Sequence, residues 1–337
     1  MKKIFFALMA VAMIALPVSA TLGIPFLASA VGVGALSAIT PKVESTALVG
    51  LNKEVWLPDL MEGFYADDMF LSECRDMSAF VDNDVINLAE AGVNPDVLIN
   101  NSSYPIATAQ RSDTPLTLSL DTYDTENTLI RAIETAELSY DKRSSIVYGH
   151  RQSLKMKFME YAAFRIAPST NGTYTPIITA TGGNNGSGNK RLLFADVLNL
   201  SKAYDEAEIP AEGRILVLSV QHRTDLQNED GELYNQLLKD KQLYGFKLYA
   251  LASKRLPRYN KTTGAKVAWA AAAAPSTDVY ASIAFHKDEV MRAQGTVDMF
   301  AKEKDPEQRG DVIGFQMRGL SMPIRNKGIA AIYSPAA

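Results

Sequence analysis

Residues 195–220 read ADVLNLSKAYDEAEIPAEGRILVLSV, and they organise the second half of the chain. Apolar residues recur with a helical period over 192–208, which predicts a helix. The segment IPAEGR, residues 209–214, places a proline and a glycine close together, as a turn requires. The apolar run ILVLSV, residues 215–220, predicts a strand. This stretch therefore predicts a helix, a tight turn and a strand in direct succession.

The elements that follow also alternate between helix and strand. Hydrophobic patterns predict the following elements: a helix over 224–241, a strand over 246–253, a strand over 282–285, a helix that begins within 286–300, and strands over 312–320 and 328–333. Upstream, a Gly- and Asn-rich loop over 168–190 includes a brief strand at 176–180. This order predicts an α+β fold built on a central mixed sheet.

The strongest periodic signal precedes these elements. Apolar residues recur every seven positions at Ile133, Tyr140, Val147, Leu154 and Tyr161. This period predicts one long amphipathic helix over about 127–166 that ends before Pro168. A two-stranded coiled coil is disfavoured, because Arg143, His150 and Lys157 occupy the other position of its seam.

A hairpin is predicted upstream of the long helix. Residues 84–89 and 116–120 have the pattern of strands, and the long polar segment between them has no helical period. Two strands joined by such a long arm indicate a protruding hairpin rather than a compact core. A short helix is predicted over 60–71, with Asp59 as its N-terminal cap.

Charge is unevenly distributed along the 337 residues. Residues 54–141 hold 18 acidic residues against three arginines and no lysine, whereas residues 142–337 hold 27 basic residues against 19 acids. The net charge of −4 does not favour a chain that wraps nucleic acid through bulk positive charge. The acidic segment is either a solvated surface or lies across a basic surface, its own or a neighbour's.

The first twenty residues, MKKIFFALMAVAMIALPVSA, have the pattern of a secretory signal peptide. Residues 4–41 carry no charge, but Gly23, Pro25 and Gly32 interrupt the apolar run, which disfavours a membrane-spanning helix of about 20 residues. Residues 1–40 are therefore a cleaved signal, an apolar packing arm, a membrane-contacting segment or the product of a misassigned start codon.

The sequence predicts no catalytic, cofactor-binding or metal-binding residues. The three histidines, His150, His222 and His286, form no i,i+3 or i,i+4 pair. His286 is expected to start or cap the helix that follows it. The only cysteine, Cys74, lies beside acids, which does not favour a reactive thiolate, and it leaves no intrachain disulfide.

Two further patterns carry little chemistry. The loop at 183–190 is similar to a phosphate-binding loop but lacks its Gly-Lys-Ser/Thr ending. Asp67-Asp68 and Asp288-Glu289 are adjacent acids that would point apart on a helix, which disfavours paired acid–base chemistry. We therefore expect a protein that is not an enzyme and needs no cofactor.

The order of the elements resembles the major capsid protein of tailed bacteriophages, which has the Hong Kong 97 type of fold. The resemblance rests on the turn at 209–214 and on four later stretches: YGFKLYALASKRLP at 244–257, ASIAFHKDEVMRAQ at 281–294, DVIGFQMRGL at 311–320 and NKGIAAIYS at 326–334. It covers about residues 50–335, and its nearest implied relatives are capsid proteins of crAss-like phages.

The resemblance implies a division of the chain. It assigns these parts: 1–40 a signal-like N-terminal segment, 41–81 an N-terminal arm, 82–124 an extended loop, 125–195 the spine helix and peripheral domain, 196–290 an axial domain, and 291–337 a return to the peripheral domain. The implied function is self-assembly, through hexamers and pentamers, into an icosahedral virion shell around double-stranded DNA, in the host cytoplasm.

The implied partners are further copies of the chain, portal and scaffolding or decoration proteins, and DNA contacted without sequence specificity; a membrane partner is not expected. Two other functions stay open. An encapsulin-like compartment shell protein would share the fold. An exported α+β binding protein with a cleaved signal would explain the N-terminal pattern, but not the hairpin and the long helix.

Overall fold

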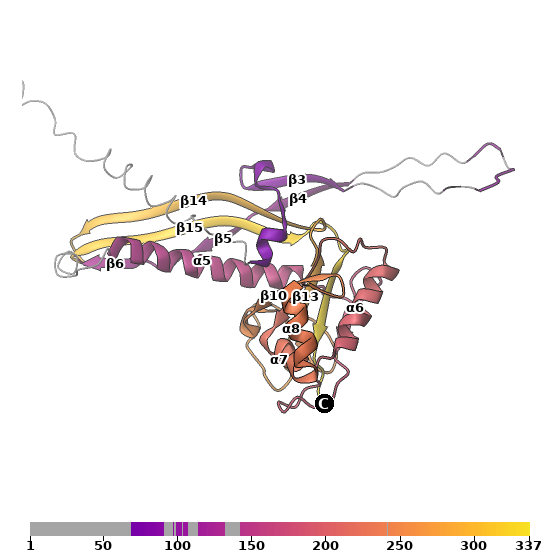
Figure 1. The fold of residues 1–337 in the computed structure, drawn as a ribbon. Coiled ribbons are helices and arrows are strands. Elements are labelled where there is room, and N and C mark those ends of the chain that lie inside the picture. The colour runs from indigo at the N-terminus through magenta and orange to yellow at the C-terminus, as the bar shows by residue number, and fades with distance from the viewer. Residues whose placement is uncertain are drawn as a thin grey trace, which may run out of the picture. The chain divides into compact units, whose positions relative to one another are not determined.

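The computed structural model describes residues 69–90, 97, 99–102, 104–106, 114–131, 142–240 and 242–337, all of which belong to one unit, Trp56–Ala337 (Figure 1). The predicted N-terminal segment 1–40 and most of the predicted helix at 60–71 lie outside these residues. The last residues of that helix form a 3-10 helix, η1 (Phe70–Glu73), in place of an α-helix.

A six-stranded mixed sheet forms the centre of the second half. Its order is β7 (Ile177–Thr179), β16 (Ile329–Tyr333), β13 (Ser282–His286), β8 (Arg214–Ser219), β10 (Phe246–Leu251) and β9 (Gln242–Leu243). β8 is parallel to β10 and antiparallel to β13, so the predicted mixed sheet is confirmed. β8 is buried along its whole length: Ile215 and Val217 join one hydrophobic cluster, and Leu216 and Leu218 join another. This explains its uninterrupted apolar sequence.

Three helices contribute to the second of these clusters. They are α6 (Phe194–Glu206), α7 (Val220–Glu229) and α8 (Gly231–Asp240). The prediction of one helix over 224–241 was wrong at its centre. There the carboxylate of Asp230 accepts hydrogen bonds from the backbone N–H groups of Glu232 and Leu233, at 3.0 and 2.9 Å, and so starts a new helix.

The turn between α6 and β8 is built around one arginine. Arg214 is 3% exposed and donates to the carbonyl oxygens of Ile209 and Pro210, at 2.5 and 3.0 Å, and to the carboxylate of Asp205 at 2.7 Å. Gly213 has a φ of +90°, and a Cβ there would lie 2.7 Å from the Lys287 side chain, so the turn needs glycine at this position. Arg214, the last residue of the IPAEGR segment, therefore stabilises the turn through hydrogen bonds to its carbonyl groups.

A second sheet contains the longest strands. β14 (Val290–Asp305) and β15 (Gly310–Pro323) pair along most of their length, β1 (Arg75–Asp76) joins β14, and β5 (Asp121–Asp124) and β6 (Thr128–Arg131) join β15. The prediction that a helix begins within 286–300 was therefore wrong. The long ladder with the next strand, β15, buries Val290, Met291 and Ala293, and this pairing outweighs the local helical pattern.

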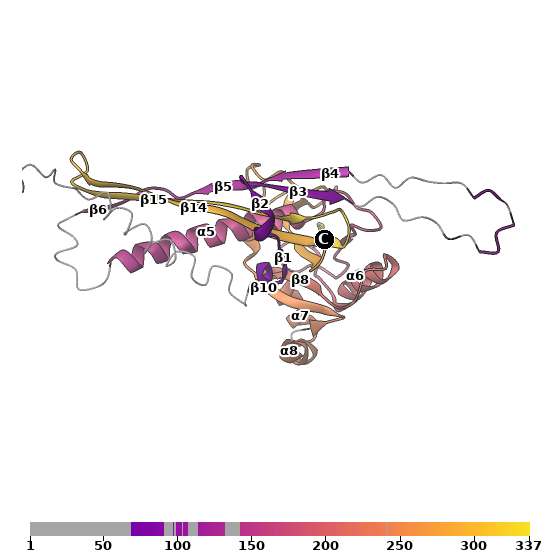
Figure 2. The ribbon, with the colours of Figure 1, turned by 90° about the horizontal axis from the view of Figure 1, so that it is seen from above.

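The long helix is α5 (Lys142–Ile166), and Figures 1 and 2 show it running beside β14 and β15. The predicted end at Ile166 is confirmed. The predicted start was wrong, because residues 128–131 form strand β6 against β15. At the other end, the Lys266 ammonium donates to the carbonyl oxygen of Ala167 at 2.6 Å, where the helix leaves carbonyls without intrahelical partners.

The predicted hairpin is confirmed. β3 (Val85–Glu90) pairs antiparallel with β4 (Thr114–Ser119), and β2 (Val81–Asp82) pairs with β3. At its base Ile86 packs in a cluster with Met291 and Leu320, which attaches the hairpin to the long sheet. The remaining described elements are the 3-10 helices η2 (Ser78–Phe80) and η3 (Ser253–Arg255) and the paired strands β11 (Arg258–Asn260) and β12 (Asp278–Tyr280).

Candidate functional site

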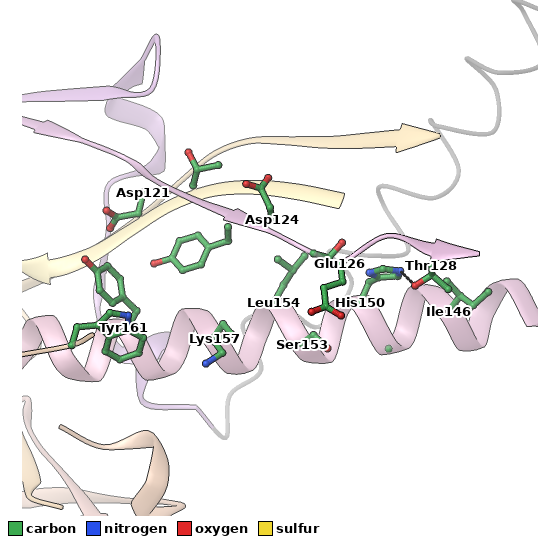
Figure 3. Close-up of a pocket in the computed structure, with 15 residues that line it drawn as sticks. Asp121, Asp124, Glu126, Thr128, Ile146, His150, Ser153, Leu154, Lys157 and Tyr161 are labelled. Atoms are coloured by element: carbon green, nitrogen blue, oxygen red, sulfur yellow. Dashed lines mark hydrogen bonds between the residues drawn. The ribbon is translucent and has the colours of Figure 1, made fainter. Parts of the chain in front are cut away.

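An open groove of about 990 Å³ lies between α5 and the β5–β6 strands. We call it the α5 groove. Figure 3 shows side chains from both elements lining it. Its lining residues include Asp121, Tyr123, Asp124, Glu126, Thr128, Ile146, His150, Ser153, Leu154, Lys157, Tyr161 and Trp269.

His150 lies where α5 meets β6. Its Nε2 atom lies 3.0 Å from the Thr128 hydroxyl, and its ring packs against Phe315 with a centroid distance of 5.0 Å (Figure 3). Burial lowers the pKa of His150 below its ordinary value, so the neutral ring is favoured. The imidazole therefore joins the helix to the strand.

Aromatic residues form one end of the groove. The ring of Trp269 meets Tyr161 edge to face at 5.0 Å and Phe164 at 5.4 Å, and it stays 41% exposed. Large, partly exposed aromatic rings supply contact area at low entropic cost, which makes this end suited to binding another molecule.

Four charged residues, Asp121, Asp124, Glu126 and Lys157, line the groove beside His150. Asp124 and Glu126 are exposed, and Lys157 forms an ion pair with Glu160 at 3.1 Å. Asp121 pairs with Arg165 at 3.2 Å. Partial burial raises the pKa of Asp121, and Arg165 opposes this rise. Both His150 and Lys157 therefore have partners within the chain.

A second candidate surface is the far end of the β3–β4 hairpin. Four large apolar side chains are exposed there: Val97 by 87%, Ile99 by 84%, Tyr104 by 76% and Ile106 by 53%. We call these four residues the hairpin tip. The sequence reasoning treated this segment as polar because asparagines and serines surround them; the clustered apolar residues were the signal that could have revealed the surface.

The acidic segment meets basic residues of the same chain. Glu73 forms an ion pair with Lys247 at 2.5 Å, and Asp76 forms one with Arg292 at 3.3 Å. A third joins Asp121 to Arg165, and a fourth joins Asp84 to Arg318. The sequence left open whether the acidic segment is a solvated surface or contacts basic residues of its own chain or of a neighbour. For these four acids, the contact is with basic residues of their own chain.

The pKa of Glu73 reflects this pairing. Partial burial alone would raise the pKa, but the hydrogen bonds from Lys247 and the Tyr249 hydroxyl outweigh burial and lower it. The carboxylate therefore stays charged and ties η1 to β10 at neutral pH.

The other two histidines lie in separate places. His286 is the last residue of β13, and its Nε2 atom lies 2.8 Å from the carbonyl oxygen of Glu212, so the expectation that it starts or caps a helix was wrong. His222 is buried, with Nδ1 2.7 Å from the Ser282 hydroxyl and Nε2 3.0 Å from the Ser334 hydroxyl. It joins α7 to β13 and to the residue after β16.

The remaining sequence candidates are structural where they are described. Burial raises the pKa of Cys74 to about 12. The side chains of Asn184 and Asn185 accept hydrogen bonds from backbone N–H groups of their own loop, 183–190. Glu289 pairs with Arg325. Within the described residues, no group of three or more His, Cys, Asp or Glu side chains could hold a metal ion. None of the helices described is long and apolar enough to cross a bilayer.

Acid should destabilise the fold through His222. Burial lowers its pKa from 6.5 to about 4, against a smaller opposing effect of Asp196. Between these values the unfolded chain binds a proton that the folded chain does not. Stability is therefore complete above pH 6.5 and falls as the pH drops towards 4, by about 3 kcal/mol for such a shift. Urea unfolding between pH 7.5 and 4.5 measures this, and His222→Gln should flatten the profile. An equally steep profile in that variant would assign the effect to other groups.

Comparison with protein-family models and with curated proteins gave no match. Solved structures with the same fold do exist. The capsid of Ralstonia phage GP4 matches with a TM-score of 0.59 and 8% identity, over 82% of this chain and 91% of that one. The capsid of the cyanophage P-SCSP1u matches with a TM-score of 0.55 and 15% identity, over 79% and 88% of the two chains.

A virus-like particle from Pyrococcus furiosus also matches, with a TM-score of 0.53 and 12% identity, over 83% of this chain and 99% of that one. At these identities the similarity lies in the arrangement of the elements rather than in shared side chains. The chain therefore has the mixed α+β fold of these phage-capsid and particle proteins.

Proposed function

We propose that this chain is the major capsid protein of a tailed bacteriophage, with the Hong Kong 97 type of fold, and that it assembles into an icosahedral head shell around double-stranded DNA. The observation that carries the proposal is the match to capsid structures over about four fifths of the chain. The relation to crAss-like phages rests on the motifs of residues 209–334 and stays a prediction.

The described elements support an assembly role. A long hairpin with an apolar end, a long helix beside a long sheet and an open groove supply surfaces that a single chain leaves uncovered. A closed shell needs head-to-tail contacts between different surfaces of identical subunits. We assign the extended loop to 82–124, the spine helix to α5 and the axial domain to most of 196–290. The strand β16, from the last part of the chain, adds to the sheet of that domain.

The partners follow from this proposal. Other copies of the chain would build hexamers and pentamers in the host cytoplasm, with portal and scaffolding or decoration proteins, and DNA would be contacted without sequence specificity. The role is structural rather than enzymatic. Residues 1–40 would then be either removed or retained as an arm whose apolar side chains pack between subunits or against the shell wall, where burial of apolar surface contributes about 25 cal/mol per Å².

Electron microscopy of the full-length chain, expressed in a bacterial cytoplasm, tests the proposal. Closed shells, tubes or regular capsomers are the expected result, and the intact mass of the assembled protein shows whether Met1–Ala20 stays attached. A monomer that is exported and cleaved after Ala20 would instead favour the exported binding protein.

An encapsulin-like compartment shell is the second candidate. It is favoured by the match that covers 99% of the chain of the Pyrococcus furiosus particle. The contents of purified particles separate the two functions, because packaged duplex DNA supports a phage head and a packaged protein supports a compartment.

Charge should contribute to contacts between subunits. Asp82, Glu90, Asp96 and Asp113 fall in sequence within the loop assigned to 82–124, whereas Asp84 and Asp121 are already paired within the chain. Replacing the first four acids with their amides should weaken assembly and reduce its dependence on salt, because complementary charge is screened beyond about 10 Å at 0.1 M salt. Light scattering across a salt series measures both effects. The charge contribution is refuted by a variant that assembles like the parent at every salt concentration.

No covalent cross-link should form through a lysine of the hairpin. Some proteins of the proposed fold join neighbours through a lysine on this loop and a distant asparagine, but residues 54–141 contain no lysine. We expect particles to dissolve into single chains on a denaturing gel. A ladder of covalent oligomers, mapped by mass spectrometry to the hairpin, would contradict this.

A further inference from the structure

A second pocket, of about 330 Å³, lies at one edge of the six-stranded sheet. Strands β16, β8 and β10 run in the same direction, because β8 is parallel to β10 and β13 is antiparallel to both β8 and β16. One lining residue follows the carboxyl end of each strand: Ser334 after β16, His222 after β8 and Ser253 after β10. The carboxyl ends of parallel strands are the usual place for ligands in α/β sheets. We call this cavity the strand-end pocket.

Two cations and one acid line the strand-end pocket. Arg258 pairs with Asp278 at 3.2 Å and donates to two carbonyl oxygens of residues 271–272, at 2.6 and 2.9 Å, so it holds this part of the lining in place. Lys261 donates to the carbonyl oxygen of Pro275 at 2.8 Å, and it has no carboxylate partner in the described part of the chain. An ammonium has three N–H donors, so Lys261 keeps donors and a positive charge for a ligand.

Uncharged donors line the same pocket. Three of its residues carry hydroxyl groups: Ser187, from the loop at 183–190, Ser253 and Tyr280. Gln221 lies in the first turn of α7, where backbone N–H groups without intrahelical partners add to the preference for an anion. His222 adds no positive charge at neutral pH, because burial lowers its pKa to about 4.

The rest of the lining is apolar. It consists of residues 273–275, which are two alanines and a proline, together with Val279 and the ring of Tyr280. Sites for small molecules combine such apolar surface with a few polar groups, and about 330 Å³ lies within their range of volumes. The ligand that fits this lining has one anionic group and a compact apolar body.

We propose that the strand-end pocket binds a small organic anion, with its phosphate or carboxylate group at Lys261 and its apolar body against residues 273–275. All the residues that carry this site belong to one chain. Binding therefore does not depend on assembly, and the shell function and the pocket can each fail alone.

Isothermal titration calorimetry of the full-length chain tests the pocket with four probes. Phenyl phosphate and benzoate each combine an anion with a ring, inorganic phosphate has the anion alone, and benzyl alcohol has the ring alone. At least one of the first two should bind with a Kd of about 1 mM or tighter, and the tighter of them identifies the anionic group. The two partial probes should bind at least about tenfold more weakly. No binding of either ring-bearing anion, or equal binding of benzyl alcohol, would overturn the proposal.

Matched variants locate the binding. Lys261→Gln keeps an N–H donor for Pro275 but loses the charge, so it should weaken binding at least about tenfold, whereas Lys261→Arg should retain it. Lys254→Gln is the control, because Lys254 is exposed and lies outside the lining, and its loss changes the net charge equally. Ala274→Leu narrows the pocket without a change of charge and should also weaken binding of the ring-bearing anion.

Thermal unfolding without ligand shows that each variant is folded. Equal weakening by Lys261→Gln and Lys254→Gln would assign the effect to overall charge and overturn the site, as would unchanged binding in Ala274→Leu. Electron microscopy of the same samples keeps the two functions apart. Particles that bind no anion would refute the pocket and leave the shell function standing, whereas a chain that binds the anion and forms no particles would do the reverse.

Discussion

Replacing Phe158 with alanine should lower the free energy of unfolding by about 3–5 kcal/mol, the range for large aromatic side chains removed from a core. Phe158 is fully buried at the centre of α5, and its ring meets Tyr123 of β5 edge to face at 5.5 Å. A Cβ on Gly319 of β15 would lie 3.0 Å from the Phe158 ring, so helix and strand approach closely here. The substitution would leave a cavity between α5 and both strands.

Guanidinium unfolding, followed by circular dichroism, measures this loss. Tyr148→Ala is the matched control, because Tyr148 lies on the same helix but is 54% exposed. Its expected effect is within about 0.5 kcal/mol. Similar losses in the two variants would mean that α5 does not pack on β15 through Phe158.

Replacing Arg214 with alanine should cost about 3–5 kcal/mol, as when one partner of a buried charged network is removed. The guanidinium supplies hydrogen bonds to two carbonyl oxygens of the turn and lies over the rings of Tyr204 and Phe246, at 5.4 and 5.9 Å. Without it, the buried carbonyl of Ile209 and the carbonyl of the more exposed Pro210 lose their donor. Lysine should not restore the stability, because it lacks the planar fork that reaches several acceptors.

A second variant, Asp205→Asn, distinguishes the stability that Arg214 gives the turn from the stability of its ion pair with Asp205. Asp205 pairs with Arg214 at 2.7 Å, but its own side chain is 65% exposed. Loss of that pair should cost no more than about 1 kcal/mol. Thermal or urea unfolding of the two variants decides the point. If Asp205→Asn costs as much as Arg214→Ala, the ion pair rather than the turn carries the stability.

Local patterns were sufficient for the elements whose neighbours in sequence are also their neighbours in space. The helix–turn–strand at 194–219, the hairpin strands and the end of α5 at Ile166 were all predicted. β6 was assigned to a helix because its partner, β15, lies about 180 residues later in the chain, and β14 was assigned to one because residues 286–300 were read alone, without the β15 strand that follows them. The ladder that decides their structure cannot be seen in a short window.

Local sequence patterns predicted less of the candidate site than of the fold. The α5 groove joins residues from 121–128, 146–161 and Trp269, and no pattern within any one of these segments marks a cavity. The hairpin tip did carry a local signal in Val97, Ile99, Tyr104 and Ile106, but only their exposure separates a binding surface from a small core.

The pairing of early segments with late ones also bears on the order of events during synthesis. β1 needs β14, β5 and β6 need β15, and β7 needs β16, which ends at Tyr333. A ribosome releases these late strands only after nearly the whole chain has been made, so the early strands wait for most of translation. Folding dominated by such distant contacts is slow and leaves strand edges open to aggregation. It would also delay a finished α5 groove until the chain is nearly complete, because its strands β5 and β6 pair with β15.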